Sequence, residues 1–437
     1  MNQKNKKTMA NAVGVGVLDD PHIKGKNQKG ITLIALVITI IVLLILAGVT
    51  ISMVLGDEGI IQNAQTAKEV TEDADDKEEE SLLQANREFA KYNIPKYDDV
   101  DDDEGFATKN STIDGKGVSS SNPVIPKGFK PVDNDDDTTI TEEATWGEPG
   151  AVDSGLVIQD EDENQFVWVP VPDITKFAVL QEGTSNYRGV LWEFSSTGEH
   201  TQLPYEENAT YSEPVAVTPD NLEKNIKAIK EEKYSTLQEQ FQAEYNYMVS
   251  SVKAYGGFYV GRYETSWDGT KVASIGGVEA MTTTTTLEQN WETSLTNNPN
   301  SATWYGLYAK QKELYPRSSD ESVVSGMIYG AQWDAIMMWM QDIQNVSDGS
   351  KKFIIDGSGM GNYSGSLVTT GYYAVNNIFD LAGNYSEFTQ ERSGKFYRMG
   401  RGGDGVELFS DPSSRFLRQL PTAQSNLLSS RIQLYVK

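Results

Sequence analysis

The longest hydrophobic stretch of the chain covers residues 31–55 and contains no charged side chain. As an α-helix this stretch would be roughly 37 Å long, because each residue adds about 1.5 Å, whereas the hydrocarbon core of a bilayer is roughly 30 Å thick. Lysines precede the stretch and acidic residues follow it, and positive charge marks the cytoplasmic side. The pattern predicts a single-pass transmembrane helix with the rest of the protein outside the cell. A cleaved secretory signal is the alternative, although its apolar region is usually shorter.

Apolar residues continue at spacings of three and four after this stretch, which is typical of a helix with one narrow apolar stripe. Pro95 is expected to end that helix. Residues 57–104 contain 17 acidic and 5 basic side chains, so we expect residues 56–97 to form an acidic helical stalk that acts as a solvated spacer. A structural calcium site among these carboxylates is the alternative, and no other cofactor is predicted. Residues 98–121 lack any apolar period and are typical of an acidic flexible linker.

The composition changes at about residue 122 to one rich in tryptophan, tyrosine and glycine. Short hydrophobic runs of the β type follow at residues 155–159, 165–171, 256–264, 326–330, 376–383, 396–403 and 430–436. Two helical patterns interrupt them, over residues 219–251 and 332–343. Few regular elements among many loops favour one α+β domain with irregular strands over residues 122–437.

Charge and residue types narrow the classes of function. The 437 residues include 37 basic and 63 acidic ones, and the net charge of −26 disfavours binding to nucleic acid. The absence of cysteine excludes disulfides, thiolate metal sites and thiol catalysis. Only two histidines, His22 and His200, leave few arrangements for a histidine metal centre or a serine–histidine–aspartate triad. We therefore expect a protein that is not an enzyme, with an unrecognised hydrolase or metal enzyme as the alternative.

The sequence KGITLI at residues 29–34 resembles the N-terminus of type IV prepilins. The resemblance implies that residues 1–30 are a cytoplasmic leader, which a prepilin peptidase cleaves between Gly30 and Ile31. It also implies contact between the apolar helix and other pilin-like subunits. Ala35 stands where the family has glutamate, a departure that favours a tip, minor or pseudopilin role, or a membrane-anchored subunit, over the major pilin.

Several later segments, taken in order, resemble the formylglycine-generating-enzyme family, whose domain has the C-type lectin fold. They are FVWVP (166–170), GGFYVGRYE (256–264), QWDA (332–335), NIFDLAGN (377–384) with Glu387, RGG (401–403) and RIQLY (431–435). The resemblance implies this fold for residues 122–437. The enzymes of the family oxidise a substrate cysteine with paired copper-holding cysteines, which this chain lacks, so that activity is not expected.

Physical chemistry assigns structural duties to most residues of these segments. Their glycines suit positive φ or close backbone approach, and their tryptophans supply large buried areas. Arg262 with Glu264, and Arg401 with Asp380, are candidate buried charge pairs. The predicted structural residues are Trp168, Arg262, Glu264, Trp333, Asp380, Gly383, Asn384, Arg401, Gly402 and Gly403.

The C-terminal stretch contains the framework RGG (401–403), PSSR (412–415), Pro421-Thr422, Arg431 and Leu434-Tyr435. This framework resembles the C-terminus of the C-type lectin fold variable proteins that retroelements diversify. In that group the positions between framework residues are rewritten to create new ligand-binding surfaces. The intervening positions here, which we predict to bind ligand, are Asp404, Val406, Leu408, Phe409, Phe416, Leu417, Gln419, Leu420, Gln424, Ser425, Leu427 and Leu428. The alternative is that the apolar ones belong to the core.

Together these features predict a surface-displayed binding protein, in which a prepilin-like anchor and an acidic stalk present a C-type lectin fold domain. The ligand would be an extracellular protein or glycan. A protein is the first choice, because hydrophobic and aromatic contacts inside a polar rim are typical of protein recognition. A minor pilin or pseudopilin of a type IV pilus or of a type II secretion-like system is the structural alternative.

Overall fold

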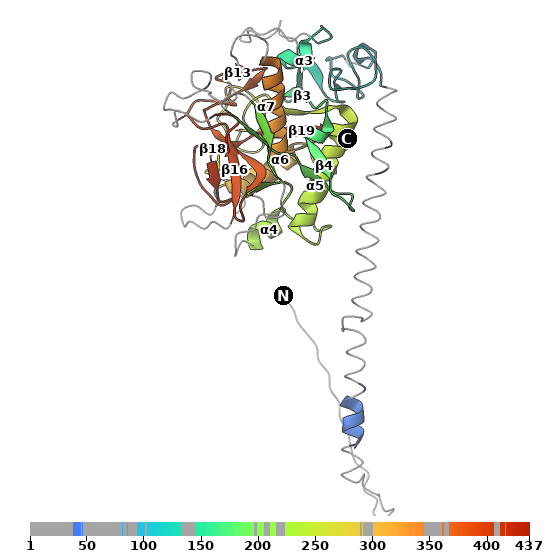
Figure 1. Ribbon diagram of the computed structural model, residues 1–437, viewed down its shortest axis with the longest axis vertical. Helices are drawn as coiled ribbons and strands as arrows, with labels where there is room; N and C mark the ends of the chain where they lie inside the picture. Colours follow the sequence, from blue (N-terminus) through green and yellow to red (C-terminus); the bar gives the residue numbers. More distant parts are fainter. Residues whose placement is uncertain are drawn as a thin grey trace, which may run out of the picture. The chain divides into compact units, whose positions relative to one another are not determined.

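The computed structural model describes residues 38–44, 46, 81, 85, 94–100, 103–132, 146–195, 199–204, 210–215, 223–288, 291, 300–344, 361, 367–405, 411–415 and 417–437. The chain divides into two compact units, Met1–Lys77 and Glu78–Lys437. The second unit combines helices with strands (Figure 1), which confirms the predicted α+β class.

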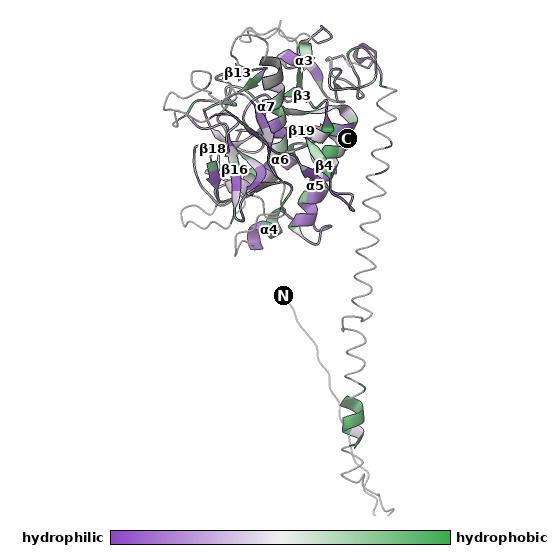
Figure 2. Cartoon of the chain, in the orientation of Figure 1, coloured by the Kyte–Doolittle hydropathy of each residue, from purple (hydrophilic) through white to green (hydrophobic). Residues whose placement is uncertain are grey.

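The predicted transmembrane helix over residues 31–55 is a wrong prediction. Among the residues that the structure describes, no helix is both long enough and apolar enough to cross a membrane. Within that range the described residues are 38–44 and 46, which are helical and exposed, and all of them except Thr39 are hydrophobic (Figure 2). The single-pass localisation that depended on this helix loses its support.

Other predictions for the first part of the chain lie outside the described residues. The cleavage site at Gly30 and Ile31 is one of them, and so is nearly all of the stalk over residues 56–97. In the stalk the structure describes Ser81 and Ala85, which are helical, and residues 94–97. The leader, its cleavage and the acidic spacer therefore stay predictions.

A six-stranded antiparallel sheet organises the second unit. Its strands, in spatial order, are β1 (Lys130–Val132), β2 (Val157–Gln159), β3 (Gln165–Pro170), β9 (Gly257–Gly261), β19 (Ile432–Val436) and β12 (Val323–Met327). β19, the last strand in the sequence, thus lies inside the sheet between β9 and β12. Each of β2, β3, β9 and β19 falls within a run that the sequence predicted to be a strand.

This sheet is buried on both faces, and alternate residues of a strand point to opposite sides. Phe166 and Trp168 of β3 belong to one core cluster, which also contains Trp304. Val167 and Val169 belong to a second cluster, which contains buried apolar residues of the helix over Gly330–Gln344. Burial on both sides explains why QFVWVP is almost continuously apolar instead of alternating.

The long helix α5 (Leu237–Tyr255) has well-defined ends. Thr236 accepts a hydrogen bond from the backbone of Glu239, and the Glu239 side chain accepts one from the backbone of Thr236, which forms a capping box. Gly256, at φ 80°, ends the helix in the left-handed region. The predicted helix over 219–251 is therefore two helices, because the cap at Thr236 begins α5 separately from α4 (Glu223–Ile229).

The other helices are short or cover the sheet. The pattern at 332–343 is confirmed as α7, which begins at the loop after β12. Helix α6 was not predicted, and it packs against β12. Their bounds are α3 (Ala151–Ser154), α6 (Thr303–Leu314), α7 (Gly330–Gln344) and the 3-10 helices η1 (Tyr97–Asp99) and η3 (Ile174–Lys176).

A second sheet includes Arg401, the first residue of the C-terminal framework. Its strands, in spatial order, are β17 (Leu417–Gln419), β16 (Tyr397–Arg401), β15 (Ser386–Ser393) and β18 (Leu428–Ser430), and β8 (Tyr211–Ser212) also pairs with β15. The pair β15–β18 is parallel, whereas the other pairs are antiparallel. Four hairpins complete the described strands: β4 (Ala178–Leu180) with β5 (Tyr187–Gly189), β6 (Trp192–Phe194) with β7 (His200–Gln202), β10 (Ser266–Trp267) with β11 (Val272–Ala273), and β13 (Ala374–Val375) with β14 (Ile378–Phe379).

The described part of the predicted flexible linker, within residues 98–121, belongs to the folded unit instead. Ala107 and Val118 are almost fully buried and join the core cluster that contains Trp168. The segment is held by an isolated bridge between Ser111 and Ile125. Irregular backbone that is held in this way has no apolar period, so its burial is not visible in the sequence. The domain boundary expected at residue 122 therefore moves towards the N-terminus.

Candidate functional site

Two adjacent tyrosines of the second unit are exposed at the surface. Tyr372 is 56% exposed and Tyr373 is 36% exposed. Both belong to the loop of residues 367–373, which leads into the hairpin β13–β14. Exposed aromatic side chains on a well-held backbone lose little conformational entropy on binding, which makes them good contact residues.

Asp380 fixes the backbone of this loop. The residue is 1% exposed, and its carboxylate accepts hydrogen bonds from three successive backbone N–H groups: Gly371 at 2.7 Å, Tyr372 at 3.0 Å and Tyr373 at 3.0 Å. Burial raises the pKa of Asp380, while these N–H groups act in the opposite direction. Hydrogen bonds to a carboxylate are stronger than neutral ones, so a buried charge holds the exposed tyrosine pair in place.

The same loop lines a polar cavity of about 380 Å³. The backbone N–H of Thr370 donates to the carbonyl oxygen of Val278 at 3.0 Å, which ties the loop to the segment around residues 279–284. The N–H of Val368 donates to Asn384 Oδ1 at 3.0 Å. The lining residues are Glu279, Thr282, Thr284, Leu367, Val368, Thr369, Tyr385 and Asn426.

Tyr385 forms the inner wall of this cavity. Its backbone N–H donates to Glu264 Oε1 at 3.1 Å, and Asn384 Nδ2 donates to Glu264 Oε2 at 2.7 Å. Burial, helped by the nearby carboxylates of Glu264 and Glu279, raises the pKa of Tyr385 to about 12. The phenol is therefore neutral at physiological pH, and its hydroxyl can both donate and accept a hydrogen bond.

Acidic groups beneath the cavity are partly balanced by one arginine. Arg431 forms a buried ion pair with Glu387, with Nε to Oε2 at 2.9 Å, and its Nη1 donates to the carbonyl oxygen of Gly261 at 3.0 Å. Burial raises the pKa of Glu264 well above its usual value, and Asp380 and Glu387 add to this effect. The cluster thus favours a proton on Glu264, because a third charged carboxylate would lie close to two others.

The C-terminal loop reaches the cavity through Asn426. Thr283 Oγ1 donates to the carbonyl oxygen of Ser425 at 2.9 Å, and the N–H of Ser425 returns a bond to Thr283 Oγ1 at 2.7 Å. The neighbours Gln424 and Leu427 are half-buried. This part of the predicted ligand-binding stretch therefore lies at the cavity, together with a residue that the prediction did not include.

The remaining predicted ligand-binding residues divide into three groups. Leu417 and Gln419 lie on the edge strand β17, and like Leu420 they are half-buried but do not line the cavity. Asp404 and Leu428 are 7% and 2% exposed. We therefore withdraw these two as contacts, because their side chains are covered and Leu428 packs in the core. The last group lies outside the described residues: Val406, Leu408, Phe409 and Phe416.

The structural duties predicted for the other motif residues agree with their burial. Trp168, Arg262, Glu264, Trp333, Asp380, Asn384 and Arg401 are all at most 1% exposed. Gly383 has φ 79°, in the left-handed region that favours glycine, as do Gly402 at 85° and Gly403 at 70°.

The predicted charge pairs need correction. Arg262 Nη1 donates to Gln165 Oε1 at 2.6 Å, while Glu264 accepts the bonds from Asn384 and Tyr385 described above. Arg401 pairs with Asp334 at 2.8 Å and with Glu391 at 3.2 Å. Asp380 instead caps the tyrosine loop. Arg401 and Glu391 are ten residues apart, whereas the other pairs join segments that are distant in the chain, which spacing along the sequence cannot identify.

A second arginine completes the buried network around Asp334 and Glu391. Arg415 Nε donates to Glu391 Oε1 at 2.6 Å, and its Nη2 pairs with Asp334. Arg415 thus links the segment 411–415 to α7 and β15.

Glu213 is a third acidic residue beside this network. Burial raises its pKa to about 8, and the charges of Glu391 and Asp334 add to this effect, while the backbone N–H groups of Ala331 and Gly330 lower the pKa.

Sequence reasoning missed the tyrosine pair and most of the cavity. Tyr372 and Tyr373 were not among the predicted contacts, and neither were the lining residues Glu279, Thr282 and Thr284. Two signals point to them: adjacent tyrosines after Gly371, and five consecutive threonines at 282–286 in a polar stretch.

No group of three or more histidine or acidic side chains within the described ranges is arranged to hold a metal ion. Comparison of the chain with protein-family models, with curated proteins and with solved structures finds no significant match in any of the three.

Proposed function

We propose that residues 94–437 form a ligand-binding domain of the C-type lectin fold, which recognises an extracellular protein through the tyrosine pair and the cavity beside it. The observation that carries this proposal is the pair Tyr372 and Tyr373. Both are exposed, and their backbone is held by a buried carboxylate beside a cavity of about 380 Å³.

The proposed fold is supported by the topology. The late strand β19 enters the interior of the main sheet and pairs with β9 and β12. The second sheet, with β15 at its centre, carries the motif NIFDLAGN immediately before it and the RGG motif at the end of β16. Most of the motif residues that suggested the resemblance are buried.

The chemistry of this surface fits a protein ligand better than a strongly charged small molecule. The tyrosines supply apolar area with a hydroxyl at the tip, and the threonines and Asn426 supply uncharged donors and acceptors at the cavity. This combination of aromatic anchors with a polar surround is typical of protein interfaces. A glycan is the second candidate, because hydroxyl and amide groups also suit sugar hydroxyls.

The loop of residues 424–427 is where sequence variation would act on this surface. Asn426 lines the cavity, and the backbone of Ser425 is fixed by Thr283. Side chains on a fixed backbone can change without loss of the fold, which is the property that a diversified loop needs. An imperfect copy of the 3′ end of the gene near a reverse transcriptase, differing mainly at adenines, would support diversification.

The test uses the full chain, a phage-displayed peptide library and a glycan array. Binders are selected on the wild-type protein and then measured on the double variant Tyr372→Ser/Tyr373→Ser. Tyr397→Ser is the matched control, because Tyr397 is 41% exposed but lies on β16. We expect most selected peptides to lose at least tenfold in affinity on the double variant, since aromatic anchors carry about 2 kcal/mol or more each.

The control variant should bind these peptides as the wild type does. Peptides that bind the double variant and the wild type equally would contradict the proposal. Selection of glycans without peptides, with the same dependence on the tyrosines, would replace the protein ligand by a glycan.

A further inference from the structure

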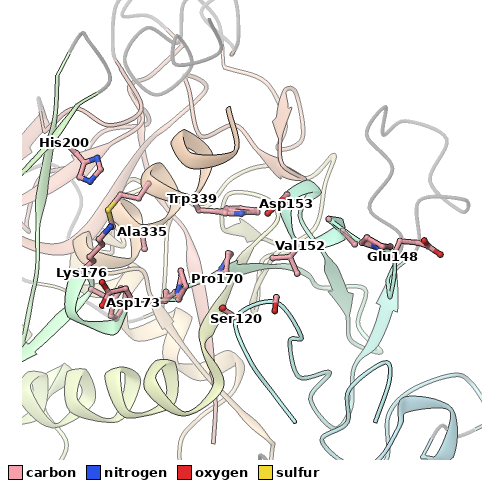
Figure 3. A pocket seen from close by; sticks show the side chains of 18 residues that line it. Ser120, Glu148, Val152, Asp153, Pro170, Asp173, Lys176, His200, Ala335 and Trp339 are labelled. Carbon is pink, nitrogen blue, oxygen red and sulfur yellow. The ribbon is translucent and has the colours of Figure 1, made fainter. Parts of the chain in front are cut away.

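Two further cavities of the second unit are lined by neither Tyr372 nor Tyr373. The larger has a volume of about 740 Å³ and walls from α3, from the segment after β3, from η3 and from α7 (Figure 3). Its lining mixes apolar side chains with carboxylates, which does not select one class of ligand. The smaller has a volume of about 300 Å³ and a more specific polar lining.

The smaller cavity lies against the edge strand β12 of the main sheet. Its floor contains Gly326 of β12 and the residue paired with it in the sheet, Gln433 of β19. Other lining residues come from α5, α6 and β15, and from the loops at residues 231–234 and 316–318. The two loops supply the exposed residues of the rim, whereas the lining residues of the strands are buried. The cavity therefore has a buried floor and an exposed rim.

Three polar groups of the floor lack a hydrogen-bond partner within the described residues. Gln390 Nε2 donates to the carbonyl oxygen of Met327 at 2.8 Å, and Gln433 Oε1 accepts from Gln332 Nε2 at 3.2 Å. The other two amide atoms, Gln390 Oε1 and Gln433 Nε2, have no such partner, and neither has the hydroxyl of Tyr329. Burial raises the pKa of Tyr329 well above its usual value, so its hydroxyl stays protonated. The floor thus offers an acceptor, a donor and a group that can do both.

These three groups are accessible from the cavity. Tyr329, Gln390 and Gln433 keep exposed fractions of 3%, 5% and 2%, and their unpaired atoms are not among those that the protein closes off from solvent. A β-carbon at Gly326 would lie 3.2 Å from Gln433 Nε2, so the glycine leaves the space beside that atom open. Unpaired polar groups on such buried side chains are costly, and native structures seldom keep them without a reason.

The charge of this lining is opposite in sign to that of the whole protein. Lys233, Lys312 and Arg317 stand against Glu231 and Glu244, so three basic and two acidic groups leave a net charge of +1. Lys312 pairs with both glutamates, and Lys233 Nζ lies 3.6 Å from Glu231 Oε2. The lysines and glutamates thus balance one another, and Arg317 supplies the excess positive charge at the rim.

We propose that this cavity binds a small molecule that combines several hydroxyl groups with one carboxylate, such as a hexuronic acid. Hydroxyl groups of the ligand accept from Gln433 Nε2, donate to Gln390 Oε1 and pair with the hydroxyl of Tyr329. Its carboxylate lies at the rim, where Arg317 attracts it. A volume of about 300 Å³ is at the lower end of the range for ligand sites, which suits a molecule of this size.

Other classes of ligand fit this lining less well. A nucleobase needs an aromatic face on which to stack, but Tyr308 is fully covered and stacked on Trp304, and the ring of Tyr329 meets Tyr245 edge to face. An apolar ligand would leave the three polar groups of the floor unpaired. A ligand with an ammonium group would meet a lining that is already positive, because lysines engage both glutamates.

The experiment measures binding to the full chain by saturation-transfer NMR. The probes are D-glucuronate, D-galacturonate and D-mannuronate, with glucose, galactose and mannose as their neutral counterparts, and propionate as a carboxylate without hydroxyl groups. We expect one of the uronates to bind with a Kd on the order of 1 mM. Its neutral counterpart should bind about threefold more weakly, and propionate should not bind.

Affinity changes in variants separate the two parts of the proposal. Tyr329→Phe removes one hydroxyl and keeps the ring, so uronate binding should weaken about tenfold. Its control is Tyr397→Phe, because Tyr397 is exposed on β16 and does not line the cavity. Arg317→Gln should weaken uronate binding about threefold and reduce its dependence on salt. Its control is Arg418→Gln, because Arg418 is exposed and does not line the cavity.

Three outcomes would overturn the proposal: no uronate binds, propionate binds as tightly as the uronates, or Tyr329→Phe and Arg317→Gln both bind the uronate as the wild type does. A neutral sugar that binds as tightly as its uronate would overturn the place of the carboxylate at the rim. The double variant Tyr372→Ser/Tyr373→Ser should bind the uronate normally, so the two proposed sites fail or stand separately.

Discussion

The buried carboxyl group of Glu213 makes a strong prediction about stability and pH. Glu213 is 1% exposed, and its carboxylate accepts hydrogen bonds from the backbone N–H groups of Gly330 and Ala331 at the start of α7. Burial, helped by the charges of Glu391 and Asp334, raises its pKa in the folded protein to about 8, against an ordinary value of 4.5.

The direction of the effect follows from proton binding. Between about pH 4.5 and pH 8 the folded protein holds a proton on Glu213, while the unfolded chain has lost it. Stability therefore falls as pH rises through this range, because the unfolded state binds fewer protons. Raising the pKa from 4.5 to about 8 corresponds to about 5 kcal/mol in the free energy of unfolding. The full contribution is present below pH 4.5 and is lost above pH 8.

Glu213→Gln isolates this contribution, because an amide does not ionise. The variant replaces the hydroxyl of the protonated acid by an NH2 group, which cannot accept a hydrogen bond from a backbone N–H, so we expect a constant cost of about 1–3 kcal/mol. The wild type should be more stable than the variant at pH 5, and the difference should shrink or change sign by pH 8.5.

Urea unfolding of the full chain, followed by tryptophan fluorescence, measures both proteins across this range. All eight tryptophans lie between residues 146 and 339, so the signal reports on the second unit. Subtracting the two pH profiles removes the titration of every other group. A difference that stays constant from pH 5 to pH 8.5 would show that Glu213 is ionised or hydrated in the folded protein and would refute the reasoning.

Two further predictions concern the buried charges. Arg415→Met removes one of the two cations that face Asp334 and Glu391, and we expect it to lower the free energy of unfolding by about 3–5 kcal/mol. The exposed control Arg418→Met should change it by less than about 0.5 kcal/mol. Equal urea midpoints for the two variants would count against the network. Asp380→Asn should lower the free energy of unfolding by about 2 kcal/mol or more, because three N–H groups lose a charged acceptor. Hydrogen exchange of residues 371–373, followed by mass spectrometry, should become faster than in the control Asp320→Asn. Unchanged exchange would mean that the carboxylate does not hold the loop.

The strands β3, β9 and β19 could be predicted because both faces of their sheet are buried. Burial on two sides leaves a continuous apolar run in the sequence, which is easy to identify. Strand β15 gives the opposite result. It reads SEFTQERS and is almost entirely buried, but its acidic side chains meet Arg431, Arg401 and Arg415 from other parts of the chain. A polar strand whose partners are distant looks like an exposed loop in the sequence.

The candidate binding surface could be predicted only where one segment supplies it. The C-terminal loop at residues 424–427 was identified by its position between framework motifs, and it lies at the cavity. Tyr372, Thr282 and Glu279 come from other loops, which backbone hydrogen bonds such as Thr370 to Val278 bring together. These loops have no period in common, so the sequence contains no sign that they meet.

The position of β19 inside the main sheet sets an order of events during synthesis. Strands β3 and β9 pair with each other, but β12 joins them only through β19, whose residues 432–436 pair with it along their whole length. These residues must therefore be synthesised before all six strands of the sheet can pair, and contacts over such long sequence separations form slowly. A chain interrupted before Arg431 would lose both the strand that links β9 to β12 and the arginine that neutralises Glu387. A nascent chain that still lacks these residues therefore cannot complete the main sheet.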